Sequence, residues 1–288
     1  MNKERQISDL ASTTVLSDDD LFMVQSGKKG MNISFVDIKN AIAEAAFNNL
    51  GSGVGYHNNR FRGISLGSSI SESQNTAIQN RTYDGIFIGD YWYIDSIYWV
   101  VACVDYYYNI GYTRYRKGNV LVVPSKSLYT AQMHNTANGE SISGDAYNIT
   151  TNGYSNSDGF LYNLDTAYNI AVSAFGNHVS SHQVHCTSST NNGVPSGSAW
   201  RTSNGVELMN TTQIFGDTQS NIYDIGSQKM RLPLMVYDPS AINIGENYWL
   251  QDTINSTDFS VVLNSGVLSN RPSSNIYGIR PVVTLSYI

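Results

Sequence analysis

Short apolar runs alternate with polar, turn-rich pieces along most of the chain, a pattern typical of β-strands rather than of long helices. The clearest hairpin is predicted where Asp95-Ser96 separates two aromatic and β-branched runs. We expect this hairpin to lie in the central core. Strand signals bounded by Gly, Asn, Asp or Ser fall at 86–89, 91–94, 97–104 and 119–123.

Helix signals are few and short. Ser71 has the character of a cap for a helix that ends near Arg81. Asp165 is a second candidate cap, for a helix that ends at Phe175 before Gly176, with an inner stripe of Ala167, Ile170, Ala171 and Ala174. A third helix is predicted from Glu207 to Phe215, before Gly216. Two or three short helices beside many short strands predict the α+β class.

The N-terminal residues predict a small hairpin followed by a helix. A strand signal ends at Val24, a Gly27–Gly30 turn follows, and a second strand covers 31–35. Ser34 is placed to cap a helix that runs to about Ala46, with Asp37 three residues after the cap. The sequence therefore predicts a module at 1–49, a Gly-rich hinge at 50–59 and a larger domain at 60–288.

The C-terminal segment has buried-strand signals at both ends. Tyr248-Trp249-Leu250 opens it, and the β-branched run 282–285 closes it. Between them Asp, Asn, Ser and Gly recur around the apolar pieces 259–263 and 267–268, which predicts short strands joined by loops. We expect this interval to display a polar surface on a rigid frame.

Two motifs in this segment carry a family resemblance. Tyr248-Trp249-Leu250-Gln251-Asp252 and Tyr277-Gly278-Ile279-Arg280-Pro281-Val282 resemble the YWLRD and YGVRPA motifs that end C-type-lectin-like modules of phage and prophage structural proteins. The resemblance covers about residues 60–288 and implies a C-type-lectin-like domain whose interval between the motifs contacts a receptor. The chain departs from the pattern at Gln251, where Arg is usual, which puts one framework ion pair in doubt.

The N-terminal module resembles the attachment module that recurs in phage tail and head appendage proteins. The shared pattern runs from Ile7 and Leu10 to the Ser34-to-Ile38 cap. The resemblance implies docking onto other virion proteins through residues 1–49 and a homotrimer. Since a module this small buries little surface alone, association has a physical motive as well. The alternative is a small subdomain that folds back on the body.

The receptor-contacting residues expected from this resemblance are polar or aromatic. Trp249, Leu250, Gly278 and Pro281 would hold the platform. The tyrosines 106–108, after the central hairpin, are expected to form a second patch. The predicted contact residues are Ser256, Asp258, Ser260, Asn264, Asn270, Arg271, Ser274, Asn275, Tyr277, Tyr106, Tyr107 and Tyr108.

Charge argues for a neutral partner. Residues 1–126 contain 12 Lys/Arg and 12 Asp/Glu, whereas residues 127–288 contain 5 and 11, so the predicted binding half holds the whole net charge of −6. Nucleic acid and anionic membranes both require a basic surface, which this half lacks. The chain also has no signal-peptide pattern and no apolar run of membrane-spanning length, so we expect assembly in the host cytoplasm and no membrane insertion.

Several segments match catalytic or metal-binding motifs in sequence but lack the structural context that those motifs require. Gly63 to Gly67 matches a nucleophile elbow around Ser65, but no buried strand precedes it. The spacing of His178, His182, His185 and Cys186 does not fit a compact zinc site. Calcium is conceivable through Asp252, Asn255, Asp258 and Asn264, although these have the character of solvated loop residues. Cys103 and Cys186 lie in unlike contexts, which disfavours a formylglycine-generating oxidase.

The sequence thus predicts a non-enzymatic phage appendage protein without cofactor or metal. It would be located in the virion and bind a bacterial surface glycan or protein. The competing prediction is a purely structural head-fibre, collar or capsid-decoration protein without a specific receptor.

Overall fold

The computed structural model describes residues 21–26, 29–49, 53–111, 113–133, 163–187, 190–191, 194–195, 198–216, 230–254 and 258–288. The chain divides into two compact units, Met1–Gly51 and Ser52–Ile288. Both mix helices with short strands, which confirms the predicted α+β class.

The first unit is a hairpin followed by a helix. Strands β1 (Leu21–Ser26) and β2 (Lys29–Ser34) pair antiparallel, and α1 spans Phe35–Asn49. The predicted cap is present, because the backbone N–H of Asp37 donates to Ser34 Oγ at 3.2 Å. Ile42, an apolar residue of this helix, is 63% exposed.

The larger unit contains a six-stranded sheet in the order β12-β17-β6-β5-β4-β3. The pairs are antiparallel except for β3 and β4. Every residue of β6 and β17 is buried, so these two strands form the middle of the core. The strands are β3 (Ser65–Gly67), β4 (Tyr91–Ile94), β5 (Ile97–Val104), β6 (Asn119–Pro124), β12 (Val206–Leu208) and β17 (Pro281–Ser286).

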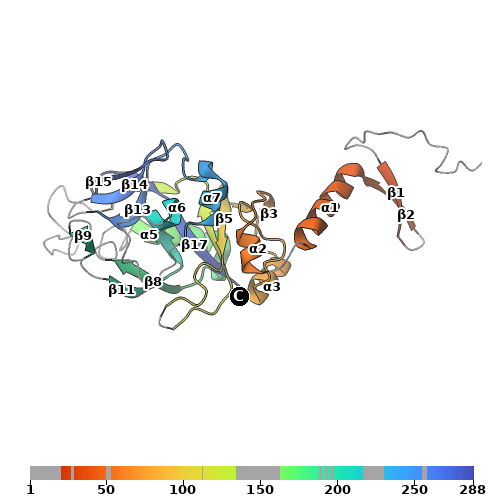
Figure 1. The fold of residues 1–288 in the computed structure, drawn as a ribbon, viewed down its shortest axis with the longest axis horizontal. Helices are drawn as coiled ribbons and strands as arrows, with labels where there is room; N and C mark the ends of the chain where they lie inside the picture. The colour runs from red at the N-terminus through yellow and green to blue at the C-terminus, as the bar shows by residue number, and fades with distance from the viewer. Residues whose placement is uncertain are drawn as a thin grey trace, which may run out of the picture. The chain divides into compact units, whose positions relative to one another are not determined.

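A five-stranded sheet, in the order β15-β14-β13-β16-β7, shares this core. Strands β13 and β16 pair in parallel, and β15 lies at one edge of the sheet. Figure 1 shows β13, β14 and β15 together in the blue C-terminal part of the unit. The strands are β7 (Tyr129–Ala131), β13 (Tyr248–Thr253), β14 (Asp258–Val262), β15 (Leu268–Pro272) and β16 (Tyr277–Ile279).

Short helices and two small hairpins surround the sheets. The predicted Ser71 helix is present with a capping box between Ser71 and Gln74. The helices are α2 (Val54–Asn58), α3 (Glu72–Asn80), α5 (Leu164–Phe175), α6 (Thr211–Phe215), α7 (Pro233–Tyr237) and the 3₁₀ turns η5 (Gly176–His178) and η7 (Pro239–Ala241). The hairpins pair β8 (His182–Thr187) with β11 (Ser198–Ser203), and β9 (Thr190–Asn191) with β10 (Val194–Pro195).

Three local predictions are corrected. Part of the predicted hinge is helix α2, whose Asn58 exchanges two hydrogen bonds with the backbone of Val104, at 2.8 and 2.9 Å. The predicted helix 207–215 is strand β12 followed by the shorter α6, because Val206 to Leu208 are buried in pairing with β17. The residue that precedes α5 is Asn163, and Asp165 lies in its first turn.

Candidate functional site

The two C-terminal motifs form one rigid platform. Tyr248 pairs with Gly278, and the Trp249 indole N–H donates to the Ala131 carbonyl at 2.9 Å. The Trp249 ring lies 4.9 Å from the Tyr277 ring and is fully buried. Position 278 requires glycine because Ser127 approaches it closely, and a Cβ there would lie 2.0 Å from Ser127 Oγ. The frame expected around the polar interval is therefore present.

Arg280 joins this platform to the six-stranded sheet. Its Nε donates to the Pro124 carbonyl at 2.9 Å and its Nη1 to the Ala241 carbonyl at 2.6 Å. The guanidinium carbon also lies 5.2 Å from the centre of the Tyr248 ring. Burial lowers the pKa of Arg280 from its ordinary value, because desolvation disfavours the charged form. Backbone carbonyls of two distant segments thus hold this cation.

Gln251 occupies the position where the lectin-like pattern has Arg. Its Nε2 donates to the Leu208 carbonyl at 3.1 Å, and the Gln251 N–H donates to the Met209 carbonyl at 2.9 Å. The neutral amide therefore fastens β13 to the end of β12 through backbone bonds.

We use the name β15 surface for five predicted contact residues: Asp258, Asn270, Arg271, Ser274 and Asn275. The first three lie on the paired strands β14 and β15, and the last two lie in the segment that leads from β15 to β16. Asn270 is exposed and its Nδ2 donates to Asp258 Oδ2 at 3.3 Å. Arg271 Nη1 donates to Ser269 Oγ and to the Asn270 carbonyl, each at 2.8 Å. Asn275 Nδ2 donates to the Tyr277 hydroxyl at 3.0 Å, which adds this predicted ring to the border of the surface.

Two other predicted residues of the interval lie elsewhere. Ser260 is fully buried between neighbouring strands, so the prediction that it contacts a receptor is wrong. Its position in the middle of β14 explains the burial, because both faces of that strand are covered. Asn264 is exposed but lies beyond the other end of β14 from Asp258. Ser256 lies outside the described residues.

The predicted tyrosine patch is mostly core. Tyr106 and Tyr107 are 3% and 6% exposed, which excludes them as a display surface. The chain turns inward here because Asp105, at φ 56°, accepts hydrogen bonds from Tyr83, Arg81 and the Asn119 N–H. Tyr108 is half-buried, and its ring stacks 3.4 Å from the Arg81 guanidinium carbon.

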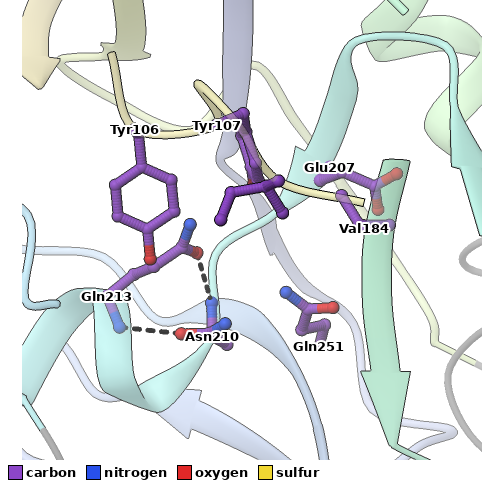
Figure 2. A pocket seen from close by; sticks show the side chains of 8 residues that line it. Tyr106, Tyr107, Val184, Glu207, Asn210, Gln213 and Gln251 are labelled. Atoms are coloured by element: carbon purple, nitrogen blue, oxygen red, sulfur yellow. Dashed lines mark hydrogen bonds between the residues drawn. The ribbon is translucent and has the colours of Figure 1, made fainter. Parts of the chain in front are cut away.

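Tyr106 and Tyr107 line a small cavity (Figure 2). Its volume is about 20 Å³, enough for about one water molecule and too small for a sugar ring. Asn210 and Gln213 bond to each other as the cap of α6, as the dashed lines in Figure 2 show. The lining is Tyr106, Tyr107, Ile110, Val184, Glu207, Asn210, Gln213 and Gln251. Sequence reasoning did not single out Asn210 and Gln213, since a capping signal inside a mispredicted helix is easily missed.

The described residues contain no group of three or more His, Cys, Asp or Glu placed to hold a metal ion. His178 Nδ1 lies 2.8 Å from the Ser286 carbonyl, and the His182 ring stacks 3.9 Å from the Tyr107 ring. The side chains of His185 and Cys186 lie outside the described residues, as does Asn255. Ser65 is exposed on β3, and the next helix starts only at Glu72, so the nucleophile-elbow geometry is not present.

No protein-family model, curated protein or solved structure matches this chain. Within the described ranges, no helix is long and apolar enough to cross a bilayer.

Proposed function

We propose that this chain is a non-enzymatic phage appendage protein with a C-type-lectin-like Ser52–Ile288 unit, which binds a bacterial surface glycan through the β15 surface. One observation carries the proposal. Exposed or half-buried Asn, Asp, Ser and Arg side chains lie on β14, β15 and the segment that leads to β16, while Trp249, Phe259 and Arg280 of the same part of the fold are fully or almost fully buried. A rigid support lets polar side chains bind without a large ordering cost.

The chemistry of this surface suits sugar hydroxyls. The amides of Asn270 and Asn275 both donate and accept, and Asp258 accepts only. Arg271 and Asp258 project to opposite faces of the sheet, because Arg271 pairs with Phe259 and Asp258 pairs with Pro272. On its own face, Asp258 offers a ligand an acceptor and no cation. Each neutral hydrogen bond contributes only about 1 kcal/mol, so several copies of the surface would be needed for firm attachment.

The Met1–Gly51 unit would supply those copies by forming a homotrimer on the virion. Ile42 is 63% exposed and Leu21 is 67% exposed, which leaves apolar surface available for subunit contacts. Light scattering should give a trimer for the full chain and a lower mass for Ile42→Glu. Asn40→Glu is the matched charge control, because Asn40 is exposed in the same helix and, two residues from Ile42, faces a different side.

Adsorption of the purified protein to host cells tests the receptor part. The double variant Asn270→Ala/Asn275→Ala should lose about tenfold or more in apparent affinity, since two hydrogen-bonding amides are removed. Asn80→Ala is the matched control, because Asn80 is exposed on α3 and distant in sequence. Arg271→Ala, compared with the exposed Arg116→Ala, tests the charged member of the surface.

Saturable adsorption that the double variant abolishes would support the proposal. Adsorption that is absent, or equal for wild type and double variant at unchanged thermal stability, would instead indicate a purely structural decoration protein.

A further inference from the structure

The β4–β5 hairpin carries a second exposed cluster that the proposed function does not use. Tyr93 and Tyr98 are each 45% exposed, and Tyr91 is half-buried beside them. The ring centroids of Tyr93 and Tyr98 are 4.6 Å apart, and those of Tyr91 and Tyr98 are 5.1 Å apart. These residues were predicted as central core, whereas the core face of the hairpin is formed by Trp92 and Trp99.

Strand pairing fixes all three rings on one face. Tyr93 lies directly opposite Tyr98, and Tyr91 alternates with the buried Trp92 to the same side as Tyr93. Ser65 of β3 pairs with Tyr91, which places its exposed hydroxyl on the same face at the sheet edge. We call Ser65, Tyr91, Tyr93 and Tyr98 the tyrosine face.

The hairpin holds this face rigidly. Its turn residues Asp95 and Ser96 have φ values of 50° and 65°, the tight two-residue turn that matches strand twist. Tyr91 N–H donates to the Ile64 carbonyl at 3.0 Å, and Trp92 Nε1 donates to Gln74 Oε1 at 3.2 Å. Tyrosine itself has only two side-chain torsions, so little entropy is lost when a ligand binds.

The ring geometry leaves surfaces for a ligand. The Tyr93 and Tyr98 planes are tilted by 43°, and the Tyr91 and Tyr98 planes by 66°, so the rings do not cover one another face to face. Within the described residues, no hydrogen bond is recorded from the three hydroxyls. An aromatic face beside a free hydroxyl matches a pyranose ring, which presents C–H groups on one side and hydroxyls at its rim.

Charge selects among possible ligands. Asp95 is the one charged residue between Tyr91 and Val104, so the hairpin offers no cation to an acidic sugar. Its carboxylate can accept from a sugar hydroxyl. A protein partner is less well matched, because three rings provide far less area than the roughly 1,000 Å² that a specific protein interface needs.

We propose that the tyrosine face is a binding site for neutral, extended glycans, separate from the β15 surface. A β-1,4-linked chain would lie with its pyranose faces on Tyr93 and Tyr98 and its hydroxyls toward Ser65 and Asp95.

Titration with soluble hexamers tests this site on the full chain. Hexamers of β-1,4-linked glucose or N-acetylglucosamine should bind, and a galacturonic acid hexamer should bind at least tenfold more weakly. Tyr93→Ala/Tyr98→Ala should reduce binding at least tenfold. Tyr93→Phe/Tyr98→Phe should lose about threefold, because the rings remain. Tyr237→Ala is the matched control, since Tyr237 is 42% exposed on α7.

NMR of tyrosine ring signals supplies a readout that needs no variant. The neutral hexamers should shift the signals of Tyr91, Tyr93 and Tyr98 and leave Tyr237 unchanged. Failure of both neutral hexamers to bind would overturn the proposal, as would equal binding of the acidic hexamer or binding that survives the alanine pair. A third outcome would also overturn the proposal. If Tyr93→Ala/Tyr98→Ala binds the hexamers normally but no longer adsorbs to a host component that protease destroys, the tyrosine face binds a protein partner.

The test is independent of the proposed function. Asn270→Ala/Asn275→Ala should leave hexamer binding unchanged, so failure at one surface does not imply failure at the other.

Discussion

The two sheets of the larger unit each bury a charged residue, but they satisfy it in opposite ways. Next to the β4–β5 hairpin, Asp90 is fully buried and accepts from Arg62 at 2.7 Å, from the Ile64 N–H at 3.0 Å and from the Phe87 N–H at 2.8 Å. At the platform formed by the two C-terminal motifs, Arg280 donates to the carbonyls of Pro124 and Ala241.

The two buried charges stabilise different kinds of contact. The donors to Asp90 come from segments within 28 residues of it, so this acid organises nearby turns. The acceptors of Arg280 are 156 and 39 residues away, so this cation joins distant segments. The first arrangement should matter most for local stability and the second for the connection between the sheets.

Removing the buried acid should have the largest effect. Asp90→Ala leaves the Arg62 guanidinium without its carboxylate and should cost about 3–5 kcal/mol. The corresponding fall in Tm is about 10 °C for a unit of this size. Calorimetry measures it, with the exposed Asp84→Ala as control. A loss below about 1 kcal/mol would contradict the role given to Asp90.

Removing the buried cation should cost less and act further away. Arg280→Leu fills most of the volume but leaves two carbonyls without this donor, at about 2–3 kcal/mol. Hydrogen exchange should increase more in β7, β13 and β16 than in β4. The exposed Arg116→Leu is the control. If hydrogen exchange increases equally in both sheets, Arg280 does not act mainly on the connection between distant segments.

Lower pH should reduce the free energy of unfolding through His57, which lies in the same part of the fold as Asp90. His57 is buried, with Nδ1 2.7 Å from the Ile86 carbonyl and its ring 4.6 Å from Phe87. Burial lowers the pKa of His57 below its ordinary 6.5. The unfolded chain therefore binds a proton near pH 6.5 that the folded chain does not, and stability falls as pH decreases below about 6.5.

The slope from this one residue is at most about 1.4 kcal/mol per pH unit. Thermal unfolding at pH 7.5, 6.5 and 5.5 measures it, and His57→Gln should show a shallower dependence than wild type. Parallel curves for the two proteins would assign the acid sensitivity to other groups.

The smallest effect is expected at the hairpin turn. Ser96 has φ 65°, a left-handed conformation that costs about 1 kcal/mol with a side chain and little with glycine. Ser96→Gly should raise Tm by about 2–4 °C and leave the tyrosine face unchanged. Ser69→Gly, in another exposed bend, is the control. An unchanged or lower Tm would show that the turn is held by something other than its backbone preference.

Local signals predicted the fold best where neighbours in sequence decide the structure. The turn at Asp95-Ser96, the Ser71 cap and the stops at Gly176 and Gly216 are all present, since each depends on a few adjacent residues.

Predictions failed where distant contacts decide. Glu207 lies in a strand and not in the predicted helix, because Val206 to Leu208 pair with β17. Tyr106 and Tyr107 are buried because the hydrogen bonds of Asp105 direct the chain toward the core. The polarity of Ser260 favours a surface position, but polarity alone does not reveal that β14 is covered on both faces. The tyrosine face was missed as a surface because its alternation with Trp92 and Trp99 resembles an ordinary core strand.

The edge position of β15 affects how copies of this chain behave when they lie close together. An unpaired strand edge is a template on which a neighbouring chain can extend the sheet, and that risk grows when many copies stand close together. Pro272 ends β15 without a backbone N–H, and the guanidinium of Arg271 donates to the Asn270 carbonyl. These two residues discourage strand addition between molecules, so the polar edge can stay open without causing aggregation.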